Sequence, residues 1–175
     1  YQLLGDQSRS IGMFRMALSF RPDFPEAHNN LGNSLKLAGK INEAIISYKQ
    51  AIIYRDNYFE AIYNLGSIMI EVGELSNAIA YFTNALTLNP NHIDALNNLG
   101  NAYKYYGSYK SAKKNYTKAL SLSQSNPDIL NNLGTLFLEK KDFYLAIKYF
   151  KKSISSNPTH QISYYNLGNA FQETG

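Results

Sequence analysis

Apolar residues between positions 93 and 122 fall into two sets, each with helical spacing. The first set lies at positions 95, 96, 99, 102, 103 and 106, and the second at 109, 112, 116, 119, 120 and 122. Apolar residues that recur every three or four positions predict the buried face of an α-helix. Gly107 separates the two sets, so this stretch predicts two helices joined by a turn.

This pattern recurs at a fixed interval along the chain. The tripeptide Asn-Leu-Gly marks each copy, at 30–32, 64–66, 98–100, 132–134 and 166–168. A constant 34-residue frame of this kind is typical of a solenoid, in which each unit buries its core against its neighbours. We therefore expect one array across residues 1–175: a partial repeat (1–24), full repeats (25–58, 59–92, 93–126 and 127–160) and the first helix of a further repeat (161–175).

Small residues predict how the two helices of a repeat pack. A glycine inside a helix costs about 1 kcal/mol relative to alanine, yet every first helix has one after its leucine. We expect these glycines to lie against the second helix, where a Cβ atom would collide. The second helices have alanine and, four residues later, an aromatic residue at the matching positions: Ala44 and Tyr48, Ala78 and Phe82, Ala112 and Tyr116, Ala146 and Phe150.

A second glycine column predicts the turns inside the repeats. Gly39, Gly73, Gly107 and Gly175 share one position of the frame, where a helix end favours a left-handed residue. Lys141 interrupts this column, so we expect a looser turn there. Pro25 and Pro127 are predicted to open first helices, because the first helical position needs no N–H donor.

These columns resemble the consensus of the tetratricopeptide repeat (TPR) family: Leu-Gly, then Ala-x3-aromatic, then a small residue and a closing proline. Ala51, Ala85 and Ala119 supply the small residue, and Pro22, Pro90 and Pro158 supply the proline. The resemblance implies an all-α fold, a right-handed TPR superhelix (α-solenoid) of antiparallel helix pairs. It also implies that the first helices line a concave groove.

Composition narrows the chemistry. Hydrophobic residues make up 45% of the chain and charged residues 17%, which is typical of an ordered chain, and no apolar run is long enough to span a membrane. The absence of cysteine excludes disulfides and thiolate metal sites and agrees with a cytoplasmic or nucleocytoplasmic location. His28, His92 and His160 have no carboxylate or hydroxyl at a spacing that suggests catalysis. We therefore expect no enzyme activity, no cofactor and no metal in this segment.

Charge is unevenly distributed. Residues 1–87 have a net charge of −1 and residues 88–175 a net charge of +5. The lysines of the last full repeats avoid the predicted buried positions and should face outward. A solvated helix face is the simplest interpretation, an acidic partner is an alternative, and we do not expect nucleic acid as a partner. These lysines are Lys110, Lys113, Lys114, Lys118, Lys148, Lys151 and Lys152.

Asparagines are the candidate functional residues. One precedes the leucine in every repeat, and polar or aromatic residues lie one position before it and three positions after it. We place these columns on the helical face opposite the buried leucine. Carboxamides offer donors and an acceptor, so such a column could bind the backbone of an extended protein segment. Alternatively, each asparagine bonds to the neighbouring helix and fixes the repeat geometry. The predicted groove residues are Asn30, Asn64, Asn98, Asn132, Asn166, Asn33, Asn101, Asn169, Tyr63 and Tyr165.

The run from Pro22 to Asn33, Pro-Asp-Phe-Pro-Glu-Ala-His-Asn-Asn-Leu-Gly-Asn, resembles the TPR arm of the O-linked N-acetylglucosamine transferases. In that family an asparagine ladder holds substrate backbones. Two hypotheses follow from this resemblance: an independent protein-binding scaffold, or the substrate-recognition arm of a larger enzyme of that kind. A resemblance to the TPR co-chaperones is rejected, because asparagine or tyrosine replaces their first carboxylate-binding lysine.

The two ends of the chain are complementary in the 34-residue frame. Residues 6–20 read as a second helix, with Phe14 and Ala17 in register, and residues 162–174 read as a first helix. We therefore expect that the open ends allow head-to-tail self-association, which would continue the solenoid.

Overall fold

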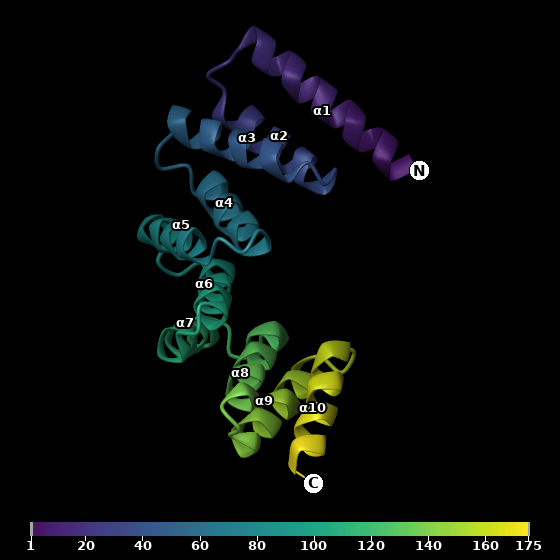
Figure 1. Ribbon diagram of the computed structural model, residues 1–175, viewed down its shortest axis with the longest axis vertical. Coiled ribbons are helices and arrows are strands. Elements are labelled where there is room, and N and C mark those ends of the chain that lie inside the picture. The colour runs from purple at the N-terminus through teal and green to yellow at the C-terminus, as the bar shows by residue number, and fades with distance from the viewer. Residues whose placement is uncertain (1, 175) are drawn as a thin grey trace. The chain divides into compact units, whose positions relative to one another are not determined.

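The computed structural model describes the backbone of residues 2–174 and the side chains of residues 7–174, and its regular elements are all helices. Short turns connect successive helices, which confirms the expected all-α fold of antiparallel pairs (Figure 1). Within the described range the helices are α1 (Gln2–Phe20), α2 (Pro25–Leu37), α3 (Ile41–Tyr54), α4 (Phe59–Glu71), α5 (Leu75–Leu88), α6 (Ile93–Tyr105), α7 (Tyr109–Leu122), α8 (Pro127–Glu139), α9 (Phe143–Ser156) and α10 (Gln161–Thr174).

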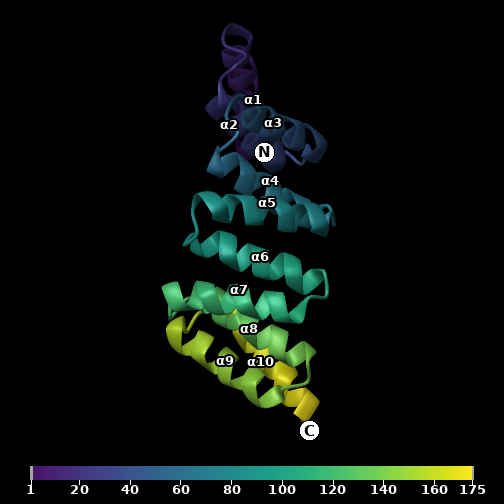
Figure 2. The ribbon, with the colours of Figure 1, turned by 90° about the vertical axis from the view of Figure 1, so that its left-hand side faces the viewer.

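The helices form two compact units, one ending at Pro90 and one beginning at Asn91. In the first unit α2 packs on α3 and α4 on α5, with α1 against α2 and α3 against α4. In the second unit α6 packs on α7 and α8 on α9, and α10 packs against both α8 and α9, as the two views in Figures 1 and 2 show.

The helix pairs are held by an aromatic ring that lies against the mid-helix glycine. A Cβ atom added to Gly32 would lie 2.6 Å from Cε1 of Tyr48, and one added to Gly100 would lie 2.5 Å from Cε1 of Tyr116. Gly134 meets Phe150 in the same way, while Gly66 leaves 3.0 Å to Phe82. These rings are buried, so the predicted close contact is confirmed in the four full repeats. In α10 an added Cβ on Gly168 would meet no atom within 4 Å.

The turns inside the repeats have the left-handed residue that the glycine column predicts. Gly39, Gly73 and Gly107 have φ angles of 74°, 80° and 84°. Lys141 adopts the same conformation, with φ 59°, and its N–H bonds to Leu138 O at 2.9 Å, as that of Gly107 bonds to Lys104 O at 3.0 Å. The expectation of a looser turn at Lys141 is therefore wrong, because the hydrogen bonds of the turn impose the backbone conformation. Gly175, in the same column, lies outside the described residues.

The first helix departs from the sequence frame, whereas the proline-initiated helices follow it. α1 runs without interruption from Gln2 to Phe20, so it begins before the second helix predicted for residues 6–20 and passes Gly5, which shares the frame position of Gly39, without a turn. Each residue added to a helix forms one more backbone hydrogen bond, which a turn at this position would forfeit. By contrast, Pro25 and Pro127 begin α2 and α8 as predicted.

Candidate functional site

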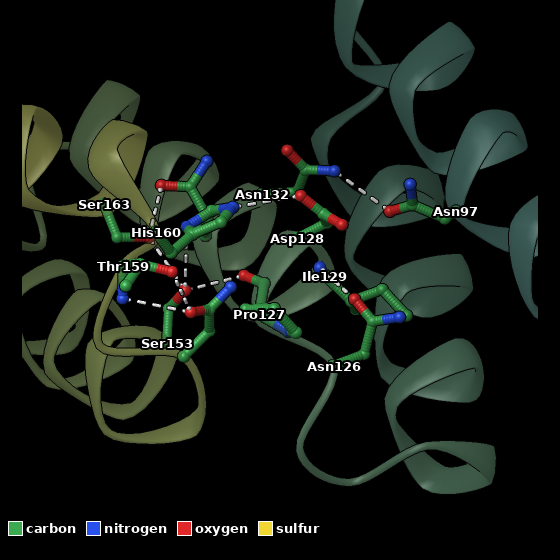
Figure 3. A network of polar contacts seen from close by, with 12 residues as sticks. Asn97, Asn126, Pro127, Asp128, Ile129, Asn132, Ser153, Thr159, His160 and Ser163 are labelled. Carbon is green, nitrogen blue, oxygen red and sulfur yellow. Dashed lines mark hydrogen bonds and ion pairs between the residues drawn. The ribbon is translucent and has the colours of Figure 1, made fainter.

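The asparagine column lies where successive first helices meet. In the first unit, Nδ2 of Asn64 on α4 donates to Oδ1 of Asn29 at 3.0 Å and to Oδ1 of Asn33 at 3.1 Å, both on α2. In the second unit, Nδ2 of Asn132 on α8 donates to Oδ1 of Asn97 on α6 at 2.9 Å (Figure 3). The next first helix repeats this contact, since Asn166 on α10 donates to Asn131 on α8 at 2.9 Å. The amides therefore bridge the repeats.

These contacts correct one part of the sequence interpretation. The sequence pattern puts the position before the asparagine column on the face opposite the core, but Asn29 and Asn131 are only 5% and 7% exposed. They are buried because the next first helix crosses them and its asparagine bonds to them. The tyrosines at this position differ from each other: Tyr63 packs edge-on against Phe82 with 5.7 Å between ring centroids, whereas Tyr165 is 67% exposed.

The remaining predicted residues lie at intermediate or exposed positions on the first helices. Asn30 is exposed, and Asn64, Asn98, Asn132 and Asn166 are partly exposed. Asn33, Asn101 and Asn169, one turn further along their helices, are also partly exposed. Asn98 forms polar interactions of its own. Each described unit thus presents carboxamides at the junction of its first helices.

A tyrosine from the second helix fixes two of these amides. The hydroxyl of Tyr48 donates to Oδ1 of Asn33 at 2.8 Å, and that of Tyr116 donates to Oδ1 of Asn101 at 2.7 Å. The alternate repeats have phenylalanine instead of this tyrosine, and Ser67 and Thr135 replace the asparagine. Their hydroxyls bond within their own helices, to Tyr63 O and Asn131 O. Sequence analysis missed this alternation, although the alternation of tyrosine with phenylalanine is visible in the sequence.

Ion pairs follow the same alternation. Nζ of Lys36 on α2 lies 2.5 Å from Oε1 of Glu71 on α4. One double repeat later, Nζ of Lys104 on α6 lies 3.8 Å from Oε1 of Glu139 on α8, and the Lys104 side chain is only 12% exposed. In each unit, one pair of first helices, α2 with α4 and α6 with α8, is therefore joined near its C-terminal ends by charge as well as at its middle by amides.

A cavity of about 400 Å³ lies near the C-terminal ends of α8 and α10. Asn169 is the only predicted groove residue among those that line it. Its wall combines carboxylates, carboxamides, one ammonium group and one aromatic ring, so it can hold a polar side chain. The lining residues are Leu138, Glu139, Lys141, Phe143, Asn169, Gln172 and Glu173.

Acidic residues in the first turns of first helices favour the helix dipole, and two of them also pair with a residue near the end of their own repeat. Oε1 of Glu26 on α2 lies 2.5 Å from Nη2 of Arg55. The pKa of Glu26 is held below its ordinary value, first by a hydrogen bond from its own backbone N–H and then by the Arg55 guanidinium. Asp128 lies in the first turn of α8, and its Oδ1 accepts a hydrogen bond of 3.0 Å from Nε2 of His160.

His160 lies at the centre of a polar network that the sequence analysis did not predict (Figure 3). Its Nδ1 lies 2.7 Å from Oγ of Ser163 while its Nε2 faces Asp128. Oγ of Ser163 also lies 2.7 Å from Oγ of Ser153, which donates to Pro127 O at 2.7 Å. The sequence spacing of His160 suggests no catalytic partner, and it also gave no sign of these contacts with a carboxylate and a hydroxyl. Asp128 and His160 are 32 residues apart, near the two ends of the repeat 127–160, and the fold of that repeat brings them together.

This Ser-His-Asp cluster has the members of a hydrolytic triad but not its accessibility. A nucleophilic serine must reach a substrate carbonyl, whereas Ser163 and Ser153 are 0% exposed. Ser163 lies in the first turn of α10, and its N–H bonds to His160 O at 3.1 Å. The network therefore fastens the start of α10 to α8 and α9.

The other histidines have packing and capping contacts. Nε2 of His28 lies 2.8 Å from Pro22 O, and its ring stacks on Tyr54 with 5.4 Å between centroids. Nδ1 of His92 accepts from Ala95 N–H and caps α6. Among residues 7–174, no group of three or more His, Cys, Asp or Glu side chains is arranged to hold a metal ion. Nor does any helix in that range have the length and apolar character needed to cross a membrane.

Comparisons with known proteins agree with this architecture. A model of the tetratricopeptide repeat matches residues 57–125, and a second such model matches residues 25–57 and 127–160. No curated protein sequence matches the chain.

Solved structures with the same fold include the crystal structure of MamA, at 28% identity and a TM-score of 0.82, with 88% of this chain and 90% of MamA covered. A tetratricopeptide repeat protein from Parabacteroides merdae is 24% identical, with a TM-score of 0.88 and coverage of 98% of this chain and 68% of that chain. YrrB, described as a TPR protein with an unusual peptide-binding site, is 19% identical, with a TM-score of 0.79 and coverage of 92% and 83%. With its 34-residue frame, its paired helices and these matches, the chain belongs to the tetratricopeptide repeat family.

Proposed function

We propose that this chain is a non-catalytic protein-interaction module that binds extended protein segments through the carboxamides of its first helices. The observation that carries the proposal is the chain of amide contacts between successive first helices. In the second unit, Asn132 and Asn166 each donate one amide hydrogen to the preceding first helix. That bond fixes the plane of each carboxamide, so a ligand meets groups that are already oriented.

Hydrogen-bond capacity supports a backbone ligand. A carboxamide has two N–H donors and an oxygen acceptor, and the contact with the neighbouring helix uses one donor of Asn132. The second donor and Oδ1 match the C=O and N–H of one peptide unit. Such recognition is independent of the side chains of the ligand, which makes an extended segment the fitting substrate class.

The proposed contact residues are those of the sequence interpretation, with their roles refined. Asn64, Asn98, Asn132 and Asn166 are the central amides, and Asn30 occupies the same position on α2. Asn33 and Asn101 are oriented by tyrosine hydroxyls from behind. Tyr165, Tyr63 and Asn169 supply flanking surface. Peptide binding by YrrB, a protein of the same fold, supports this use of the scaffold.

The experiment is a selection of phage-displayed random peptides on the whole chain, followed by calorimetry with the strongest peptide. Replacing Asn132 and Asn166 together by alanine should weaken binding by about 1–3 kcal/mol, since each hydrogen bond contributes about 0.5–1.5 kcal/mol. The matched control is the double variant Asn97→Ala and Asn131→Ala, which breaks the same interhelix bonds from the other side. Equal losses of affinity in both variants would show that the amides only fix the geometry of the repeats, and would contradict the proposal.

A second candidate is the substrate-recognition arm of a larger enzyme similar to the O-linked N-acetylglucosamine transferases. The observation that favours it is the asparagine at the same place in every first helix, as in that family's ladder. Both candidates use the same amides and differ in what is joined to them. A sugar-nucleotide-binding α/β region encoded after residue 175 would select this candidate, and a protein without one would select the independent module.

A further inference from the structure

The second helices of the second unit, α7 and α9, carry positive charge and no negative charge. α7 and α9 contain seven lysines and no acidic residue. The second helices of the first unit, α3 and α5, contain between them only Lys49 and Glu43 as charged residues. All seven lysines are exposed, as predicted. We call this region the lysine surface: Lys110, Lys113, Lys114, Lys118, Lys148, Lys151 and Lys152.

Three carboxylates of this unit are engaged elsewhere. Asp142 caps α9 by accepting from Leu145 N–H at 3.1 Å, Asp128 faces His160, and Glu139 faces Lys104. Among residues 7–174, the structure shows no ion pair for six lysines of the surface, and the seventh, Lys118, has an interaction of its own. Exposed charges of one sign attract a partner of the opposite sign.

Aromatic rings hold the lysines of the two helices in one arrangement. Nζ of Lys113 on α7 lies 5.2 Å from the centroid of the Phe137 ring. That ring stacks on Tyr149 of α9, with 5.4 Å between centroids and 11° between planes. Nζ of Lys152 then lies 5.8 Å from the Tyr149 ring. Both lysine–ring distances are within the range of a cation–π interaction. The contacts therefore link α7 to α9 through the stacked rings of Phe137 and Tyr149.

Two hollows lie beside the charges. A cavity of about 320 Å³ is lined by Tyr144, Ile147, Lys148 and Lys151 on α9. A second cavity, of about 340 Å³, lies between the two helices and is lined by Thr117, Leu120, Ser121, Gln124 and Lys152. The first hollow therefore has an aromatic and an aliphatic wall, the second has one aliphatic side chain among polar ones, and each includes an ammonium group.

We propose that the lysine surface docks an acidic amphipathic helix of a partner protein. Carboxylates of such a helix would face the lysines, and its apolar side chains would enter the hollows. Nucleic acid fits less well, because residues 91–175 contain no arginine, the residue that best pairs with phosphate in a bidentate manner, and bases need no aliphatic hollow. This surface lies on second helices, so it is distinct from the amides of the first helices and does not depend on the function proposed for them.

The test uses the whole chain and a fluorescein-labelled synthetic helix with glutamates on one face and leucines on the other. Anisotropy titration should show binding that weakens with added salt. The double variant Lys148→Glu and Lys151→Glu should lose roughly tenfold or more in affinity. The control Arg9→Glu and Lys49→Glu makes the same change in net charge at exposed positions of the first unit and should leave affinity almost unchanged. Circular dichroism melts establish that each variant folds.

Three comparison probes complete the design. A glutamate-only peptide of the same length should bind more weakly than the amphipathic helix, because it leaves the hollows empty. Oligo-dT and phosphatidylglycerol vesicles should bind more weakly as well. No binding of the amphipathic helix, an equal loss in the control variant, or tighter binding of oligo-dT or vesicles that depends on Lys148 and Lys151 would each overturn the proposal.

Discussion

The hydroxyl of Tyr116 donates a 2.7 Å hydrogen bond to Oδ1 of Asn101, across the helix pair α6 and α7. The next repeat has Phe150 and Thr135 at the same positions, and Thr135 satisfies its hydroxyl within α8. Both kinds of repeat therefore have an aromatic ring at this position, but they satisfy the polar groups beside it with different hydrogen bonds. Changing one member of a pair should be costly, and changing both should not.

This relationship gives a first prediction. Tyr116→Phe should lower the free energy of unfolding by about 1–3 kcal/mol, because the oxygen of Asn101 loses its donor. Adding Asn101→Thr should recover most of that loss, since the pair then matches Phe150 and Thr135. Urea unfolding of the single and double variants measures the effect. A double variant no more stable than Tyr116→Phe alone would show that the hydrogen bond does not explain the alternation.

The same tyrosines predict a sensitivity to alkaline pH. Burial raises the pKa of Tyr48 to about 12 and also raises the pKa of Tyr116 above its ordinary value of 10.0. A raised folded-state pKa means that the folded chain holds the phenolic proton more tightly than the unfolded chain. The contribution to stability is therefore complete below about pH 10 and decreases as pH rises from 10 toward the folded-state values.

Urea unfolding at a series of pH values above about 9 measures this slope. Stability should fall with pH in the unmodified protein, and the fall should be shallower in the double variant Tyr48→Phe and Tyr116→Phe, which has lost both titrating groups. Tyr144→Phe removes the hydroxyl of a residue that is 76% exposed and should leave the slope unchanged. Identical slopes in all three proteins would contradict the assignment to buried tyrosines.

The mid-helix glycines should differ in their tolerance of alanine. An added Cβ at Gly100 would lie 2.5 Å from the buried Tyr116 ring, and overpacking of about 1–3 kcal/mol should exceed the gain in helix propensity of about 1 kcal/mol. At Gly66 the distance to Phe82 is 3.0 Å, so the two effects should nearly cancel. Thermal melts should show Gly100→Ala less stable than the parent and Gly66→Ala close to it. Equal stability of the two variants would refute this packing argument.

How much the sequence could predict depends on how far apart the interacting residues are. Contacts inside one repeat, such as Gly100 with Tyr116, followed from the 34-residue frame and elementary helix geometry. Contacts between repeats did not, because the frame does not say how successive first helices cross. The burial of Asn29 and Asn131 depends on that crossing. The pairing of His160 with Asp128 joins the two ends of one repeat, whose distance the frame does not give either. The prediction of a looser turn at Lys141 was wrong for another reason. The preference of a non-glycine residue against the left-handed conformation is weaker than the hydrogen bonds of the turn.

The last prediction concerns association of the chain with itself. Gly168 on α10 has open space where the other repeats have an aromatic ring. Phe14 on α1 occupies the ring position of the frame, one repeat before Tyr48, and is only half-buried. The helix α1 of one copy should therefore pack on α10 of another, with Phe14 against Gly168. Contacts of this head-to-tail kind add copies without closing, so they give open chains of growing length.

Sedimentation velocity over a range of concentrations measures this association. The average mass should rise steadily with concentration, without a plateau at a dimer. Phe14→Asp should abolish the rise, because a carboxylate cannot enter the apolar space beside Gly168 without losing its hydration. Gly168→Leu should abolish it from the other side, while Phe20→Asp, at an 83% exposed position near the end of α1, should leave it intact. A chain that stays monomeric at all concentrations, or association that survives both Phe14→Asp and Gly168→Leu, would rule out this mode of assembly.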